Sequence, residues 1–367
     1  MKRFAIAAGG TGGHLFPGLA VAEVLHARGH EVMVLTSEKH IDAVATEGRT
    51  EFRIERLPGI GLPKGISLGT ARFFLRFASG ILHCNRLLAD FRPAAVLGMG
   101  GFTSTAPILA GRLRGLPVFV HESNAIPGKA NRLNAKLAGG LLVGFQDCAR
   151  RLPKLTCTYT GTPVRNALQK NKLPKTEALQ RFGLSPDRKT VLVMGGSQGA
   201  AGVNVAMMEA SLSLGAGFQF IHLTGAADEE AVRAFYLRAN IPAWVGAFHH
   251  AMQEAYGAAD LAVARSGAAS LTELAHFELP SILIPYPHAA EDHQTFNATI
   301  FSEAGAAVLL QERDANPSRL AGEIRGILDE PTRWKEMREA NAGLSVEDAA
   351  QRVAQVLLDA VEVGGLL

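Results

Sequence analysis

The chain has 367 residues, of which 47% are hydrophobic and 19% are charged, so it is long enough and apolar enough to form two ordinary globular cores. Its 37 Lys and Arg residues barely outnumber its 34 Asp and Glu residues, which gives no case for a nucleic-acid partner, whose phosphates require a clustered basic face. The three cysteines have neither the even number of a disulfide framework nor zinc-ligand spacing, and a reducing compartment is expected. No stretch reaches the roughly 18 continuous apolar residues of a transmembrane helix, so any membrane contact should be peripheral.

Short apolar runs alternate along the chain with segments of helical length. This alternation predicts βαβ units and parallel sheets, and therefore an α/β protein made of two doubly wound halves. The expected strands of the first half are Phe4 to Ala8, Glu31 to Leu35, Ala94 to Leu97 and Val118 to Val120. Those of the second half are Thr190 to Met194, Phe218 to Leu223, Leu261 to Ala264 and Ser281 to Pro285.

The join between the halves is expected near Gly161, which predicts domains at 1–161 and 162–344. Beyond them, Ser345 can cap a helix whose apolar residues recur at helical spacing as far as Ala360. We expect this helix, 345–363, to pack back on the first domain.

Both halves open with a strand that runs into a glycine-rich turn, at Gly9 to Gly13 and at Gly195 to Ala200. Glycines let backbone amides approach a phosphate, and the start of the following helix adds a partial positive charge. The second turn, which contains Ser197, therefore predicts a diphosphate site. A tight strand-to-helix turn without a ligand is the alternative.

Two further segments of the second half follow expected strands. Glu273 lies about a turn and a half into the helix after Arg265, where its carboxylate could accept hydrogen bonds from ribose hydroxyls, although a solvated helix-face glutamate is the alternative. Gln294 and Asn297 carry donors and acceptors suited to sugar hydroxyls. The His and acidic residues of that loop lack a ligand spacing, so no metal is expected there.

Polar residues also follow the expected strands of the first half. His14 begins a glycine-rich helix, where the pKa of an imidazole can be lowered so that it acts as a neutral base, although a structural His bonded to the backbone is the alternative. The polar residues expected to converge at this sheet edge are His14, Thr103, Ser104, His121, Glu122 and Asn124.

Seven motifs then occur in one order along the chain: GGTGGH from Gly9, GMGGF from Gly98, HESN from His121, GTPVR from Gly161, GGSQGA from Gly195, SGAASLTE from Ser266 and HQTFNA from His293. Together they resemble the MurG-type UDP-N-acetylglucosamine transferases of peptidoglycan synthesis, which are two-domain GT-B glycosyltransferases. The resemblance implies two Rossmann-like domains with an interdomain cleft. It also implies inverting transfer of N-acetylglucosamine from UDP-N-acetylglucosamine to the 4-hydroxyl of undecaprenyl-pyrophosphoryl-N-acetylmuramyl-pentapeptide.

We expect His14 to act as the catalytic base. No metal or cofactor is expected, because amides and dipoles at helix starts could hold the leaving diphosphate and the chain has no Asp-X-Asp triplet. His249 stands where the family often has an apolar residue near uracil, and Phe102 and Ser123 also depart from the common pattern. The remaining residues implied in substrate binding are Thr11, Gly12, Gly13, Asn124, Arg165, Ser197, Ala268, Ala269, Ser270, Leu271, Thr272, Glu273 and Gln294.

The segment from Lys64 to Arg92 holds five basic residues and one acid among aliphatic and aromatic residues, a mixture typical of a face that meets an anionic membrane surface. An amphipathic helix packed on its own core is the alternative. The resemblance favours membrane contact and a peripheral location on the cytoplasmic side of the inner membrane. Two rival functions share the expected donor: a UDP-N-acetylglucosamine 2-epimerase-like enzyme, and a non-catalytic UDP-sugar sensor that docks other cell-wall synthesis or division proteins.

Overall fold

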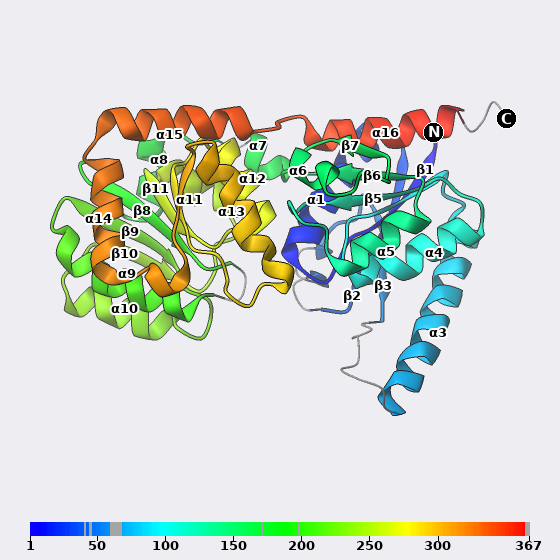
Figure 1. Ribbon diagram of the computed structural model, residues 1–367, viewed down its shortest axis with the longest axis horizontal. Coiled ribbons are helices and arrows are strands. Elements are labelled where there is room, and N and C mark those ends of the chain that lie inside the picture. The colour runs from blue at the N-terminus through cyan, green and yellow to red at the C-terminus, as the bar shows by residue number, and fades with distance from the viewer. Residues whose placement is uncertain (40–41, 44–45, 59–67, 171, 197–198, 364–367) are drawn as a thin grey trace. The chain divides into compact units, whose positions relative to one another are not determined.

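The computed structural model describes residues 1–367 except 40–41, 44–45, 59–67, 171, 197–198 and 364–367 (Figure 1). The chain divides into two compact units. The first unit is Met1–Asn166 with Glu347–Leu367, and the second unit is Ala167–Val346. Each unit is built on its own parallel sheet with helices on both faces, which is the α/β architecture expected from the alternating apolar runs.

The sheet of the first unit has seven parallel strands in the order β3-β2-β1-β4-β5-β6-β7. Strand order reverses between β1 and β4, which makes their carboxyl ends a topological switch point where ligands usually bind in such sheets. The strands are β1 (Arg3–Ala7), β2 (Glu31–Ser37), β3 (Arg53–Leu57), β4 (Ala95–Gly98), β5 (Val118–Glu122), β6 (Gly140–Val143) and β7 (Cys157–Tyr159).

Side chains of β1 alternate between two apolar cores, one on each face of this sheet. Phe4 and Ile6 join the core with α1 and α16, and Ala5 and Ala7 join the core with α3 and α4. Helix α16 packs against α1 through buried Val353 and Leu357. The helices of this unit are α1 (Gly12–Ala27), α3 (Leu68–Phe91), η1 (Phe102–Ser104), α4 (Thr105–Leu113), α5 (Lys129–Leu137), α6 (Gln146–Arg150) and α16 (Ala349–Val363).

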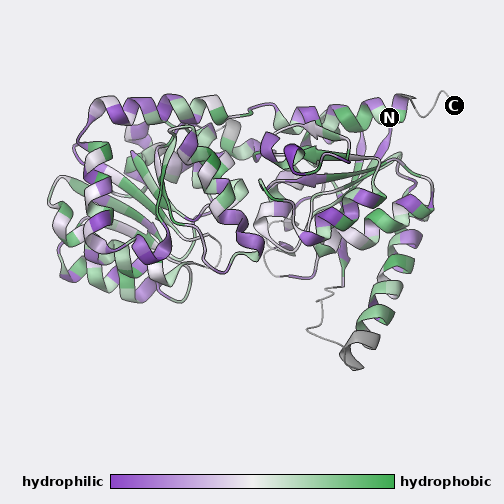
Figure 2. Ribbon diagram, viewed as in Figure 1, coloured by the Kyte–Doolittle hydropathy of each residue, from purple (hydrophilic) through white to green (hydrophobic). Residues whose placement is uncertain are grey.

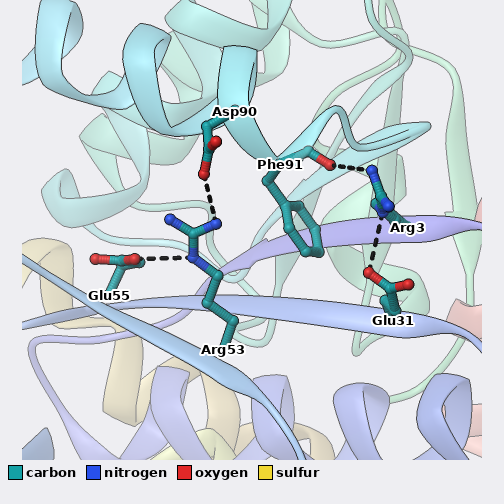
Figure 3. A network of polar contacts seen from close by, with 6 residues as sticks. All are labelled: Arg3, Glu31, Arg53, Glu55, Asp90 and Phe91. Carbon is teal, nitrogen blue, oxygen red and sulfur yellow. Dashed lines mark hydrogen bonds and ion pairs between the residues drawn. The ribbon is translucent and has the colours of Figure 1, made fainter.

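The end of α3 is fixed at the amino edge of this sheet by a network of polar contacts (Figure 3). Arg3, which starts β1, contacts Glu31 at 3.0 Å and donates to the carbonyl of Phe91 at 3.3 Å. Arg53, which starts β3, donates to Asp90 at 2.7 Å, and this bond raises the pKa of the Arg53 guanidinium. Because α3 ends at the amino edge, it runs antiparallel to the strands and begins towards their carboxyl ends.

The sheet of the second unit has six parallel strands in the order β10-β9-β8-β11-β12-β13. Its strand order reverses between β8 and β11, so this unit also has a switch point. The strands are β8 (Lys189–Met194), β9 (Phe218–Leu223), β10 (Ala243–Gly246), β11 (Leu261–Ala264), β12 (Ser281–Leu283) and β13 (Ala307–Leu309).

A local sequence signal sets the start of α14 in the second unit. Helix α14 has Pro317 as its first residue, and the side chain of Asn316 accepts a hydrogen bond from the Arg319 amide at 3.0 Å. The helices are α7 (Asn166–Lys170), α8 (Lys175–Arg181), α9 (Ala201–Leu214), α10 (Glu229–Arg238), α11 (Met252–Ala258), α12 (Ala268–His276), η2 (Ala290–Asp292), α13 (His293–Glu303), η3 (Glu312–Asp314), α14 (Pro317–Leu328) and α15 (Pro331–Leu344).

A fully buried histidine, His222 of β9, connects this strand to helices α9 and α10. The amide nitrogen of Asn204 donates to the Thr224 carbonyl at 2.9 Å and to the Asp228 carboxylate at 2.8 Å, so the Asn204 oxygen is the acceptor towards His222. His222 Nε2 therefore donates to Asn204 Oδ1, and His222 Nδ1 accepts from the Tyr236 hydroxyl, each at 3.1 Å. This network requires a neutral imidazole.

Burial lowers the pKa of His222 to about 3, from about 6.5 in the unfolded chain. Below pH 6.5 the unfolded chain binds a proton that the folded chain excludes until about pH 3, so the free energy of unfolding should fall as pH falls through this window. A His222→Gln variant should reduce the pH dependence by up to about 1.4 kcal/mol per pH unit. Urea unfolding between pH 7 and 4.5 measures it, with fluorescence as the signal because Trp244 and Trp334 both lie in this unit. Equal slopes would contradict the prediction.

The three cysteines differ in accessibility. Cys84 and Cys148 are fully buried, and burial raises the pKa of both thiols to about 12, whereas Cys157 is only partly buried. Since the thiolate is the reactive form, we expect Ellman's reagent to modify no more than Cys157 in the native protein, and all three thiols in urea. A Cys157→Ser variant should show no native reaction, and rapid modification of a second thiol would be inconsistent with this fold.

Candidate functional site

In both sheets, loops gather at the carboxyl edge around the switch point. In the first unit these loops follow β1, β4 and β5, which are adjacent strands. In the second unit they follow β8, β11 and β12, which are also adjacent. Almost all the residues proposed from the sequence belong to these loops or to the first turns of the helices that follow them.

His14 lies in the first turn of α1, which begins with Gly12 and Gly13 directly after Thr11. Its Nδ1 is 3.2 Å from the Thr11 hydroxyl. The loop after β4 passes against the imidazole, because a Cβ placed on Gly100 would lie 3.1 Å from both His14 Cδ2 and His14 Nε2. Gly100 also has a φ of +108°, so a side chain there is excluded by conformation as well as by space.

Glu122, at the end of β5, is 2% exposed, and its carboxylate accepts four hydrogen bonds. Oε1 accepts from the backbone and side-chain nitrogens of Asn124, both at 2.9 Å. Oε2 accepts from the Gly128 amide at 3.0 Å and from Asn131 Nδ2 at 2.8 Å. The buried charge is thus compensated by N–H donors, and it fixes the loop that carries Asn124.

His121 is fully buried, and burial lowers the pKa of its imidazole. Nε2 donates to the Gly161 carbonyl at 2.9 Å, and Nδ1 lies 3.3 Å from the Ser123 hydroxyl. Such a neutral imidazole, with both nitrogens used, connects β5 to the segment that contains Arg165. The Arg165 guanidinium lies 4.4 Å from the ring centre of Phe16 in α1, so Arg165 lies beside the helix of His14 within the first unit.

The glycine turn between β8 and α9 is packed against the end of β9. Gly199 has a φ of +76°, and a Cβ there would lie 2.3 Å from the Thr224 carbonyl oxygen, so only glycine fits. The backbone amide of Arg265 donates to the Met194 carbonyl at 3.2 Å, which joins the starts of the two loops after β8 and β11. Ser197 lies outside the residues that the structure describes, so its assignment stays a prediction.

The predicted run Ala268 to Glu273 forms the first turn and a half of α12, after Gly267 at the N-cap. Ala268 and Leu271 face the core, with Leu271 completely buried. Their side chains are therefore packing residues, and only backbone groups remain for a ligand at those positions. The partly exposed members of the run are Ala269, Ser270, Thr272 and Glu273.

Gln294, in the first turn of α13, is tied to the start of α12. Its backbone oxygen accepts from the Ser266 hydroxyl at 2.8 Å, and its side-chain oxygen accepts from the Tyr286 amide at 2.9 Å. Asn297 Nδ2 donates to the Ser266 carbonyl at 3.1 Å. These bonds bring the HQTFNA segment to the loop after β11.

His249 follows β10, and its Nε2 lies 3.0 Å from a carboxylate oxygen of Glu254 in α11. Its ring lies 5.1 Å from Phe182 and 5.4 Å from Trp244, measured between ring centres. These three partners were not predicted, because Phe182 and Trp244 are far from each other in sequence and Glu254 has the pattern of an ordinary helix residue.

The sequence also did not predict that a second residue of α11, Tyr256, contacts a proposed site residue. The Tyr256 hydroxyl donates to Glu273 Oε2 at 2.7 Å. Helix α11 therefore holds side chains at two predicted positions, His249 through Glu254 and Glu273 through Tyr256. In the described part of the chain, no group of three or more His, Cys, Asp or Glu side chains is placed to hold a metal ion.

Comparison with known proteins agrees with this architecture. Residues 4–142 match the glycosyltransferase family 28 N-terminal domain, and residues 190–353 match the glycosyltransferase family 28 C-terminal domain. The two sheets, their glycine-rich loops and these matches define a two-domain glycosyltransferase of the GT-B fold.

Full-length relatives narrow the class. The chain is 37% identical over 358 residues to the UDP-N-acetylglucosamine–N-acetylmuramyl-(pentapeptide) pyrophosphoryl-undecaprenol N-acetylglucosamine transferase of Geobacter sulfurreducens, covering 96% of this chain and 97% of that protein. It is also 37% identical over 360 residues to the protein of the same name in Methylococcus capsulatus, covering 98% of each. The chain belongs to this MurG-type transferase family.

Solved structures show the same fold. MurG of Acinetobacter baumannii superposes with a TM-score of 0.77 at 26% identity, covering 98% of this chain and 100% of that one. The UDP-GlcNAc 2-epimerase of Neisseria meningitidis, solved with UDP-GlcNAc bound, superposes with a TM-score of 0.72 at 15% identity, covering 97% of this chain and 100% of that one. The epimerase likeness concerns the fold alone, since the two sequences are so different.

Proposed function

We propose that this protein transfers N-acetylglucosamine from UDP-N-acetylglucosamine to the 4-hydroxyl of lipid-linked N-acetylmuramyl-pentapeptide, with inversion at the anomeric carbon. The observation that carries the proposal is the full-length identity to transferases with this donor and acceptor in their names. The glycine-rich loops at both switch points agree with it, because they offer backbone amides to phosphorylated substrates.

In this proposal the second unit binds the donor. The starts of α9 and α12 lie at the ends of the adjacent strands β8 and β11, and neither helix has an acidic residue in its first turn. Their amides and dipoles would hold the diphosphate and stabilise the negative charge on departing UDP. Side chains would complete the site: Ser197 at the glycine turn, Glu273 at the ribose, Gln294 at the sugar hydroxyls and His249 near the uracil ring.

The first unit would bind the acceptor and carry the base. As the acceptor oxygen attacks the anomeric carbon, the bond to the UDP oxygen breaks, and His14 Nε2 takes the hydroxyl proton. For Nε2 to accept this proton, Nδ1 must carry the ring hydrogen, and the Thr11 hydroxyl, 3.2 Å from Nδ1, is its acceptor. Gly12, Gly13, Asn124 and Arg165 would line the same edge and contact substrate.

A single incubation series tests the proposal. The protein is given UDP-N-acetylglucosamine with and without the lipid-linked muramyl acceptor, and the products are separated. Transfer to the lipid that depends on the acceptor supports the proposal. Formation of the 2-epimer without acceptor would instead indicate an epimerase, and the absence of any product with tight UDP-sugar binding would indicate a sensor.

We also propose that the protein binds the anionic cytoplasmic face of the inner membrane through the α3–α4 apolar patch, formed by Phe74, Leu75, Leu82 and Leu113. These side chains are 61%, 73%, 61% and 70% exposed. Figure 2 shows apolar and polar residues side by side along α3. Exposed Arg76 and Arg86 lie on α3, Arg112 lies on α4, and exposed Arg114 is the C-cap residue of α4, which suits anionic headgroups.

The described part of α3 has both a packed face and an exposed face. Phe77, Ile81 and Leu88 pack in or against the core, while Phe74 and Leu75 are exposed. Lys64 and Ile66 lie outside the described residues, and no helix in the described ranges is long and apolar enough to cross a membrane. Phe74 and Leu75 lie near the start of α3, towards the carboxyl edge of the sheet, where the adjacent Phe73 contacts Phe102 with ring centres 5.6 Å apart. A membrane-bound acceptor would therefore be presented at the edge that carries His14.

Vesicle co-sedimentation tests the membrane proposal. The bound fraction should rise with the phosphatidylglycerol content and fall with added salt. A Phe74→Ser/Leu75→Ser variant should bind less, whereas Leu237→Ser is a matched control, because Leu237 is 80% exposed on α10 of the second unit. Binding that does not depend on anionic lipid would contradict the electrostatic part.

A further inference from the structure

Tyr256 is a buried tyrosine of α11, and its side chain joins three elements of the second unit. It is 3% exposed, and its hydroxyl donates to Glu273 Oε2 of α12 at 2.7 Å. The same hydroxyl lies 3.9 Å from the sulfur of Met194, the last residue of β8. The ring packs against Phe277 with ring centres 5.1 Å apart.

The contact with Met194 places the Tyr256–Glu273 pair beside the end of β8, where the glycine turn begins at Gly195. A glutamate on a helix surface ordinarily samples many rotamers, and ordering it costs conformational entropy. A buried phenol needs an acceptor, so the Tyr256 hydroxyl selects the Glu273 rotamer that reaches it. One carboxylate oxygen of Glu273 is thus fixed before any ligand binds.

We propose that Tyr256 is a positioning residue that sets the ribose specificity of the donor site by holding the Glu273 carboxylate ready to accept bonds from the ribose hydroxyls. The inference rests on the proposed function, in which Glu273 binds the ribose.

The Tyr256→Phe variant isolates this role, because phenylalanine fills the same space and keeps the ring contact with Phe277. The variant loses the hydrogen bond to Glu273 and the contact of the hydroxyl with the Met194 sulfur. Met194→Leu is the matched control: it removes the sulfur contact and leaves the phenol–carboxylate bond in place.

The readout is the ratio of the dissociation constants of 2′-deoxy-UDP and UDP, measured by displacement of a fluorescent UDP analogue. A ratio does not depend on the fraction of folded protein, so a general loss of stability does not mimic the effect. We expect Tyr256→Phe to lower the ratio about fivefold, the effect of one hydrogen bond, mainly by weakening UDP. Met194→Leu should keep the wild-type ratio, and kcat of Tyr256→Phe should stay within about twofold of the wild type because the reacting atoms are untouched.

Glu273→Gln separates failure of the inference from failure of the proposed function. If Glu273→Gln loses ribose discrimination while Tyr256→Phe keeps it, the positioning role is overturned and the ribose assignment stands. If Glu273→Gln keeps the wild-type ratio, the ribose assignment itself fails, and the inference fails with it. The double variant Tyr256→Phe/Glu273→Gln should have the same ratio as Glu273→Gln alone, because the two residues act as one unit.

Discussion

Replacement of His14 by alanine is expected to lower kcat by about 100- to 10,000-fold, the usual contribution of a general base. The imidazole lies against the Gly100 backbone and contacts the Thr11 hydroxyl, so its position is defined before substrate binds. Steady-state transfer with the lipid-linked acceptor measures the loss. Binding of UDP-N-acetylglucosamine, measured by calorimetry, should remain within about twofold, because the proposed donor residues of the second unit are unchanged.

His26→Ala is the matched control for this experiment. His26 lies in the last turn of the same helix and is exposed, so its removal should leave turnover at the wild-type level. A His14→Ala enzyme with wild-type turnover and intact donor binding would remove His14 from the mechanism, and the base would have to be sought elsewhere.

Replacement of Glu122 by glutamine should destabilise the first unit by about 3 kcal/mol or more. The carboxylate accepts four N–H bonds, and a glutamine offers one oxygen and one NH₂ group at the same place. Two of the donors would then face another donor. Thermal unfolding followed by circular dichroism measures the loss of stability, and turnover should fall as well because Asn124 is released.

Asp147→Asn provides the comparison for Glu122→Gln. It also replaces an acid by its amide in the first unit, but Asp147 is 41% exposed and pairs only at the surface with Arg150. Surface pairs of this kind contribute about 0–1 kcal/mol, so little change is expected. Similar effects of the two substitutions would show that the buried network of Glu122 has no special role.

The fold was predictable to the extent that strands are continuous apolar runs. The runs that begin at Phe4 and at Thr190 became the central strands β1 and β8, which are buried on both faces. The edge strands β3, β7, β10 and β13 were not predicted, and neither was the inner strand β6. Each has at most five residues, and β3 includes the charged residues Arg53, Glu55 and Arg56. Edge position weakens the signal that sequence patterns depend on.

The candidate site was predictable where glycines and strand ends mark it. Its supporting side chains were not, because Tyr256 has the pattern of an ordinary buried helix residue and the contact with Glu273 arises only from tertiary packing. Glu122 was expected among the polar residues at the sheet edge, but its four donors become visible only in the folded loop. Hydrogen bonds between distant segments leave no periodic trace in a sequence.

The position of α16 at the end of the chain affects how the first unit folds during synthesis. The first unit is discontinuous, since buried Val353 and Leu357 of α16 complete the core over α1. During synthesis the second unit leaves the ribosome whole before that core can close. A chain stopped at residue 346 would therefore keep every residue of the second unit, yet expose apolar surface on the first, and aggregation of nascent or proteolysed chains should begin there.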